Sequence, residues 1–345
     1  MRLGRVINMR KSNFILFFPI LTFVLSSLPA TSLAAGKLGP MTPMTGLHNA
    51  EFVDFESEFV DEKFRIFVAA PTFVEPGKTY PVIYVLDANG FFGIVMETAR
   101  LLAITNEIPA AYVVGIGYAV NDGLVGVLSK RYRDLTPTRG GELEELFRLV
   151  GAAAETVTPG GGPGFLRFIV EELKPSIEAA YPVDPNDSTI GGGSLAGLFG
   201  SWVLLTQPEK FQRYIIFSPS VWWNEYEFWR WEEALAARTE DIDAAAFVTA
   251  GGLERVELMK EQTMAWLDEA EGPAKQHAEA LVDGYRKYGY PRMVSMTPKF
   301  VDKLKSRNYP SLRIDVHNLP DETHLSVGPG AWSRGLRYVF GVWEP

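Results

Sequence analysis

Hydrophobic and polar residues alternate in two stretches near the start of the chain, and apolar residues cluster in compact runs further along it. The alternating stretches, residues 51–60 and 63–71, predict an antiparallel hairpin. The later runs are rich in Val, Ile, Tyr and Phe, which is typical of buried strands, and helical patterns separate them. This alternation predicts an α/β fold: a mainly parallel central sheet with helices on both faces and an N-terminal antiparallel hairpin. The predicted strands span residues 80–87, 111–117, 187–192, 213–218, 246–251 and 312–318, and the helical patterns include residues 91–103, 165–181 and 333–343.

Polar, aromatic and titratable residues follow the end of each predicted strand. In open α/β sheets, ligands bind beyond the carboxyl ends of the strands, so a functional site is expected there. Surface loops are polar in any protein, which is the alternative explanation for a single loop. Six consecutive strand ends share this content, and they lie at residues 86–90, 118–123, 193–197, 219–226, 252–257 and 319–324.

The segment "GGGSLAG" joins a predicted strand to an apolar helical run and carries Ser194. In α/β-hydrolases the nucleophile sits on a sharp turn of this kind, and the residues two before and two after it must be small. Gly192 and Ala196 occupy those positions, so the pattern is G-x-S-x-A. A phosphate-binding loop would need a Lys after the glycines, and none follows. Ser194 is therefore predicted to be a nucleophile, with a plain structural turn as the alternative.

A serine nucleophile needs a general base, and His324 lies just past the last predicted strand. The chain has only three other histidines, none at such a position. The third member of the predicted triad is Glu254, because it follows the strand between Ser194 and His324, and this fold orders its triad Ser, acid, His. Asp321 and Glu322 are rival acids, and a Ser–His pair without an acid is a further alternative.

An oxyanion hole needs two backbone N–H groups aimed at the developing negative charge. One is expected from Leu195, which follows the nucleophile at the start of a helix. The other is expected from the loop after residues 80–87, where the amide of Asn89 is the candidate.

Four residues are candidates for substrate binding. Trp222 and Trp223 follow a strand end and would wall an acyl or aryl pocket, although aromatic residues in such segments often pack in the core. Arg131 and Arg133 would bind an anionic group of the substrate. Their alternative role is an ion pair with Asp134 or another acid.

The first 34 residues are typical of a signal peptide. Four basic residues and no acid precede an apolar run of about 15 residues, and small residues at 32–34 predict cleavage after Ala34. The run is shorter than the roughly 20 residues that span a membrane, so no stable membrane insertion is expected. Residues 35–50 are interpreted as a linker, residues 51–345 as the folded domain, and the mature protein as periplasmic or extracellular.

Charge and composition exclude several classes of partner. Removing residues 1–34 takes away four Lys/Arg, and the net charge falls from −9 to −13, which disfavours nucleic acid and anionic membranes. The chain has no Cys, so disulfides and Cys-based sites are excluded. It also lacks an H-E-x-x-H motif, and neither a metal nor another cofactor is expected.

Several blocks occur in the order seen in a known family. They are "YPVIYVLDANG", "RYRDLTPT", "FLRFIVEELKPSIEAAYPVDP", "GGSLAGLFG", "FQRYIIFSPSVWW", "DETHLSV" and "RGLRYVFG". Over residues 52–344 the chain resembles the esterase family of α/β-hydrolases that includes esterase D and the enterobactin and salmochelin esterases. The resemblance implies Ser194 as nucleophile, His324 as base, and "RYRD" and "VWW" at the substrate cleft.

Two features depart from the family pattern: Ala196 replaces a glycine, and the stretch 255–310 is long for one crossover. That stretch is expected to form a partial cap over the cleft or a helical layer on the sheet. The sequence as a whole predicts an exported serine carboxylesterase that acts through an acyl-enzyme on a small-molecule ester, with a siderophore ester as one candidate. The alternatives are an acyltransferase and a catalytically silent ligand-binding protein, and the oligomeric state is left open.

Overall fold

The computed structural model describes residues 46–119, 123–140, 144, 157–289 and 292–341. The predicted signal peptide and most of the predicted linker lie outside these residues. Among the described residues, no helix combines the length and hydrophobicity needed to cross a membrane.

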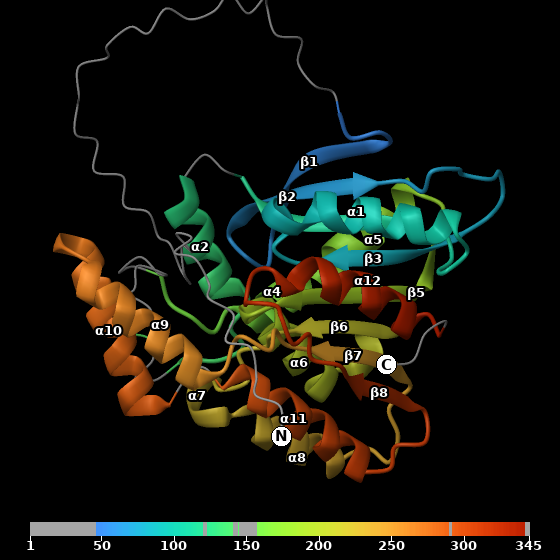
Figure 1. Cartoon of the computed structure of the whole chain (residues 1–345). Coiled ribbons are helices and arrows are strands. Elements are labelled where there is room, and N and C mark those ends of the chain that lie inside the picture. Colours follow the sequence, from blue (N-terminus) through green and yellow to red (C-terminus); the bar gives the residue numbers. More distant parts are fainter. Residues whose placement is uncertain (1–45, 120–122, 141–143, 145–156, 290–291, 342–345) are drawn as a thin grey trace, which may run out of the picture.

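A mixed sheet forms the centre of the molecule (Figure 1). Its strands lie in the order β1-β2-β4-β3-β5-β6-β7-β8. β1 pairs with β2, and β2 with β4, in antiparallel fashion, while all other neighbours run parallel. The bounds are β1 Ala50–Ser57, β2 Glu62–Ala69, β3 Tyr80–Val85, β4 Tyr112–Tyr118, β5 Val183–Gly193, β6 Arg213–Phe217, β7 Ala244–Thr249 and β8 Leu312–Val316.

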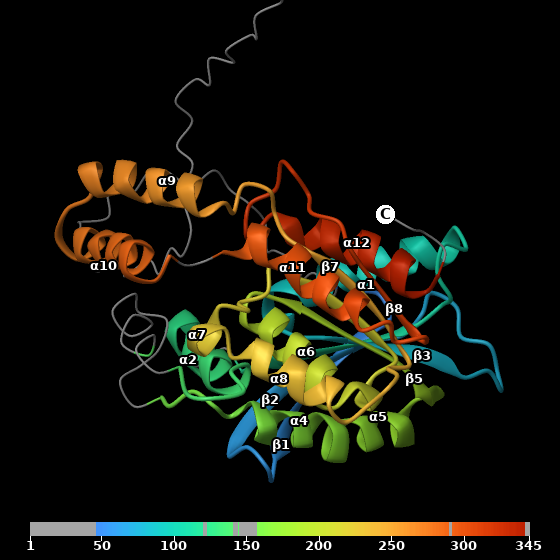
Figure 2. The ribbon, with the colours of Figure 1, turned by 90° about the horizontal axis from the view of Figure 1, so that it is seen from below.

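Helices cover both faces of the sheet (Figure 2). One apolar core lies between the sheet and α1 (Ala88–Ile104) with α12 (Val327–Val339). The larger core lies on the other face, beneath the remaining sheet-covering helices. These are α4 (Gly162–Arg167), the π-helical turn η2 (Phe168–Leu173), α5 (Lys174–Ala180), α6 (Leu195–Thr206), α8 (Phe228–Ala236) and α11 (Met293–Ser306).

The apolar runs are continuous because the central strands are buried on both faces. Every residue of β3 and β4 is buried, whereas β1, at the edge of the sheet, is mostly exposed. Strands covered on both sides carry unbroken apolar runs, and edge strands with one solvated face alternate. The fold predicted from the sequence is confirmed.

The long stretch 255–310 divides into two parts. α11 packs against β7 and β8 and so belongs to the helical layer on the sheet. α9 (Val256–Glu269) and α10 (Gly272–Tyr288) pack against each other and stand beyond the carboxyl ends of the parallel strands, as does α2 (Gly123–Asp134) (Figures 1 and 2). The prediction of a cap therefore concerns α9 and α10 alone, and it stays a prediction.

Candidate active site

Ser194 lies in a strained turn between β5 and α6. Its backbone has φ 59° and ψ −120°, outside the regions that ordinary L-residues occupy. The turn is held from both sides, because Ser194 N–H donates to the Phe217 carbonyl at 3.1 Å and Ser220 N–H donates to the Ser194 carbonyl at 3.1 Å. Ser194 is half-buried while the residues next to it are buried. Backbone strain that the surrounding structure enforces is typical of functional sites. Here the strained residue is the one whose side chain is partly exposed, so the turn places the Ser194 hydroxyl at the surface of the site.

Two glycines make this turn sterically possible. A Cβ placed on Gly192 would lie 2.5 Å from the Cβ of Ala196, and one on Gly193 would lie 2.1 Å from the ring of Phe217. The departure from G-x-S-x-G is thus accommodated, because Gly192 leaves the space that the Ala196 methyl group fills.

His324 and Glu254 are in direct contact. His324 Nδ1 lies 2.7 Å from Glu254 Oε2, and the two side chains are 7% and 0% exposed. A carboxylate oxygen only accepts, so in the neutral form of the ring Nδ1 carries the proton and Nε2 has the lone pair. Asp321 is exposed and Glu322 is half-buried, and it is the Glu254 carboxylate that meets the imidazole. This arrangement prepares His324 to accept a proton through Nε2.

Backbone contacts hold the loops of these two residues together. Gly252 N–H donates to the Leu319 carbonyl at 2.7 Å, and Leu253 N–H donates to the Glu322 carbonyl at 3.0 Å. A Cβ on Gly251 would lie 2.4 Å from the carbonyl oxygen of Glu322, so the loops approach closely only because Gly251 has no side chain. The paired glycines of the run "AGGLE" (250–254) are the sequence signal of this close approach.

The carboxyl ends of four adjacent strands thus supply the candidate site. Ser194 follows β5, Ser218 follows β6, Glu254 follows β7 and His324 follows β8. Ser218 was not among the predicted site residues, because it was assigned to the end of the predicted strand 213–218. Its hydroxyl donates to Glu254 Oε1 at 2.5 Å.

The two predicted oxyanion donors lie at helix starts. Leu195 is the first residue of α6 and Asn89 is in the first turn of α1, where N–H groups have no partner within the helix. The Asn89 side chain is engaged elsewhere: Nδ2 donates to the Tyr118 carbonyl at 2.9 Å, and Oδ1 accepts from the Tyr118 N–H at 2.8 Å. Only its backbone amide is therefore a candidate, and the assignment of both donors stays a prediction.

Arg131 and Arg133 are both paired, which is the alternative that the sequence left open. Arg131 binds both carboxylate oxygens of Asp87 at 2.8 Å. Burial disfavours its charge, but the Asp87 carboxylate outweighs burial and raises the pKa of Arg131. Arg133 binds Asp134 at 2.7 and 2.9 Å and Glu62 at 3.3 Å. These pairs oppose the predicted role of the two arginines in holding an anionic substrate.

The two tryptophans predicted at the cleft are both buried members of the larger core. Trp223 is fully buried in the larger core, and its Nε1 donates to the Thr138 carbonyl at 3.2 Å. This burial favours the packing role that the sequence left as the alternative to a cleft wall. Trp222 is 7% exposed at the same strand end. Directly after them, Asn224, Glu225 and Tyr226 have positive φ angles of 46°, 55° and 63°, a strained run that the sequence did not reveal.

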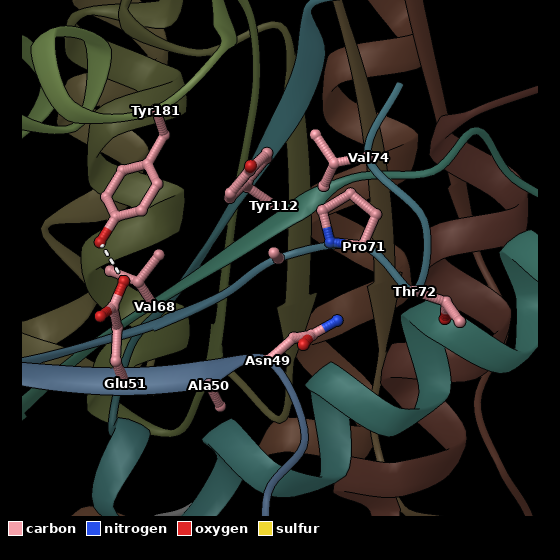
Figure 3. Close-up of a pocket in the computed structure, with 10 residues that line it drawn as sticks. Asn49, Ala50, Glu51, Val68, Pro71, Thr72, Val74, Tyr112 and Tyr181 are labelled. Carbon is pink, nitrogen blue, oxygen red and sulfur yellow. Dashed lines mark hydrogen bonds between the residues drawn. The ribbon is translucent and has the colours of Figure 1, made fainter. Parts of the chain in front are cut away.

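A separate pocket of about 480 Å³ lies at the opposite end of the sheet (Figure 3). Tyr112, at the start of β4, and Tyr181, just before β5, form one wall, and the Tyr181 hydroxyl donates to Glu51 at 2.8 Å. This pocket is remote from the Ser194 end of the strands and is not part of the candidate site. Its lining comprises Asn49, Ala50, Glu51, Val68, Ala70, Pro71, Thr72, Val74, Tyr112 and Tyr181.

Within the described ranges, no group of three or more His, Cys, Asp or Glu side chains is arranged to hold a metal ion. The candidate site combines a hydroxyl on a strained turn with a buried imidazole–carboxylate pair, and these are the groups that nucleophilic catalysis by serine requires.

Several known proteins are similar to this chain in sequence and architecture. Residues 139–292 match the family described as "Putative esterase". The chain is 34% identical over 281 residues to the ferri-bacillibactin esterase BesA of Bacillus subtilis, covering 80% of this chain and 84% of that protein. It is 32% identical over 146 residues to the siderophore triacetylfusarinine C esterase of Aspergillus fumigatus, covering 42% of this chain and 45% of that protein.

A solved structure supports the same grouping. The BES protein of Bacillus cereus superposes with a TM-score of 0.65 at 27% identity, over 89% of this chain and 99% of that one. The identity to the Bacillus subtilis protein extends over most of both chains, well beyond the serine segment. The chain therefore belongs to this esterase family of the α/β-hydrolase fold.

Proposed function

We propose that this protein is a serine esterase that cleaves a siderophore ester through an acyl-enzyme. Ester hydrolysis follows from membership of the family, and the siderophore is inferred from the relatives, which are named as siderophore esterases. The observation that carries the catalytic assignment is the buried contact of 2.7 Å between His324 Nδ1 and Glu254 Oε2. These residues follow β7 and β8, at the same end of the sheet as the strained Ser194 turn after β5.

The reaction proceeds in two steps. Ser194 Oγ attacks the ester carbonyl while His324 Nε2 takes its proton, and the tetrahedral oxyanion is stabilised by backbone N–H groups, for which Leu195 and Asn89 are the candidates. His324 returns the proton to the departing alcohol, which leaves an acyl-enzyme. Water, deprotonated by His324, then releases the carboxylic acid and restores Ser194. Glu254 stabilises the imidazolium in both steps.

The test combines labelling with a substrate panel. A fluorophosphonate should give one adduct that maps to Ser194, absent in Ser194→Ala and strongly slowed in His324→Ala. The same enzyme should hydrolyse iron-loaded bacillibactin or triacetylfusarinine C, with products followed by mass spectrometry. Enterobactin and a neutral aryl acetate complete the panel. Loss of Ser194 should lower kcat by about 10³-fold or more.

Three outcomes would contradict the proposal or part of it. A folded Ser194→Ala variant with wild-type hydrolysis would exclude the serine mechanism. Cleavage of the aryl acetate without cleavage of any siderophore would retain the esterase and reject the substrate class. Transfer of the acyl group to an added alcohol in preference to water would indicate an acyltransferase.

We further propose that the protein is exported and that residues 1–34 are removed. This rests on the basic start, the apolar run and the small residues at 32–34. A periplasmic or extracellular esterase would meet siderophores outside the cytoplasm.

A further inference from the structure

Ser218 is a buried serine whose hydroxyl points at the proposed catalytic acid. It follows β6 directly and is 0% exposed. Its Oγ donates to Glu254 Oε1 at 2.5 Å, a short hydrogen bond between two buried side chains. Hydrogen bonds to a charged acceptor are stronger than neutral ones, so this contact constrains the carboxylate.

The two carboxylate oxygens of Glu254 have separate tasks. Oε1 accepts from the Ser218 hydroxyl at 2.5 Å and from the Gly251 N–H at 2.7 Å. Oε2 faces His324 Nδ1 at 2.7 Å. Two donors on Oε1 oppose rotation of the carboxylate, because rotation would break both bonds inside a buried site. The fixed carboxylate therefore keeps Oε2 directed at the imidazole of His324.

The backbone of Ser218 is unfavourable for serine. Its φ is +42°, where glycine is the residue with the least strain. The turn is nevertheless well anchored, since Ser218 N–H donates to the Thr249 carbonyl at 2.8 Å. Two residues later, Ser220 N–H donates to the Ser194 carbonyl at 3.1 Å. One short turn therefore contacts both the acid and the nucleophile.

We propose that Ser218 is a positioning residue for catalysis: it fixes the Glu254 carboxylate so that His324 keeps the ring orientation needed to accept the Ser194 proton. This rests on the proposed function, in which these three residues form the triad. The Ser218 proton is not transferred in the reaction. Without the hydroxyl, Oε1 keeps only the Gly251 donor, the carboxylate samples other rotamers, and the imidazole loses its orientation for part of the time.

The experiment compares Ser218→Ala and Ser218→Gly with wild type on an aryl acetate. Loss of an orienting hydrogen bond behind a catalytic group typically lowers activity by about 10- to 100-fold, and the loss should appear in kcat with little change in KM. Glycine relieves the strain at positive φ, so Ser218→Gly should have a higher melting temperature than Ser218→Ala and yet be equally slow. Equal rates at unequal stability distinguish positioning from a structural role.

Ser201→Ala is the matched control. Ser201 is also 0% exposed, and its hydroxyl donates to the Gly197 carbonyl at 2.8 Å within α6. Its removal deletes a buried serine hydroxyl without touching Glu254, so kcat should stay at the wild-type value.

A double-mutant cycle with Glu254→Gln gives the second readout. If Ser218 acts only through the carboxylate, Ser218→Gly should lower kcat no further in the Glu254→Gln background. Full multiplication of the two losses would overturn the proposal, as would wild-type kcat in both Ser218 variants. Ser194→Ala keeps the two hypotheses apart: activity in that variant refutes the serine mechanism itself, whereas an inactive Ser194→Ala beside fully active Ser218 variants refutes only the role of Ser218.

Discussion

At the scale of single residues, the serine turn depends on which of two positions carries a methyl group. Gly192 and Ala196 lie so close that a Cβ on Gly192 would stand 2.5 Å from the Ala196 Cβ. Real side chains cannot approach to that distance, so one of the two positions must remain glycine. In this chain it is the position before the serine, and the family glycine after the serine is replaceable for that reason.

This steric relation predicts a compensating pair of substitutions. Gly192→Ala should lower the free energy of unfolding by about 1–3 kcal/mol, the usual cost of overpacking a close-packed core, and should also slow fluorophosphonate labelling of Ser194. Adding Ala196→Gly should restore much of both, because it removes the colliding methyl group. Urea unfolding of the two variants measures the effect. Equal destabilisation with and without Ala196→Gly would show that the collision is not the cause.

At the scale of elements, the start of α1 is set by an ion pair from another helix. Asp87 precedes α1 and has a left-handed backbone, with φ 52° and ψ 39°. Arg131 of α2 donates two hydrogen bonds of 2.8 Å to its carboxylate. The first turn of α1 carries Asn89, whose amide is the candidate oxyanion donor. The ion pair is thus placed to hold that turn in position.

The element-scale prediction concerns Arg131→Met. If Arg131 positions α1, kcat should fall for a neutral aryl acetate and for an aryl hemisuccinate alike, by about tenfold or more, since a lost oxyanion donor costs 10²–10³-fold. If Arg131 binds an anionic group instead, KM should rise for the hemisuccinate alone. Arg65→Met is the control, because Arg65 binds Asp54 through two bonds of 2.8 and 3.0 Å on the edge hairpin. It should leave both substrates unaffected.

At the scale of the whole molecule, the parallel strands bring all the proposed chemistry to one end of the sheet. Residues 194, 218, 254 and 324 follow four adjacent strands, β5 to β8. α9 and α10 stand at that same end, whereas the 480 Å³ pocket lies at the other. The two ends of the sheet therefore have different features. One end carries the proposed triad, and the other carries a pocket whose lining includes two tyrosines.

Export is the prediction that belongs to this scale. Expression of the full chain in a bacterial host should yield an exported protein whose mass corresponds to a start at Ala35. A variant with Leu16→Asp and Leu25→Asp breaks the apolar run and should keep its full mass inside the cell. An exported wild-type chain that retains residues 1–34 would contradict the cleavage site, and retention of the wild type inside the cell would contradict export.

The fold class, the serine turn and the order of the triad candidates could be predicted from the amino-acid sequence alone. These properties are local: burial on both faces requires continuous apolar runs, and a tight strand-to-helix turn requires small residues around Ser194. Hydropathy and the positions of the glycines are therefore enough to predict where the strands end and where the serine turn lies. The family follows from the same blocks, because they recur in a set order along the chain.

The contacts between polar side chains, in contrast, depend on how the chain folds in three dimensions. Glu254 contacts His324, which lies 70 residues later in the chain, because the loops that carry them meet. Arg131 is paired with Asp87 and is not a free cation. Trp223 is buried in the core, and the Ser218 hydroxyl contacts Glu254. Each outcome depends on distances between segments remote in sequence. A side chain of a given type serves as ligand, packing or support according to the neighbours that the fold supplies.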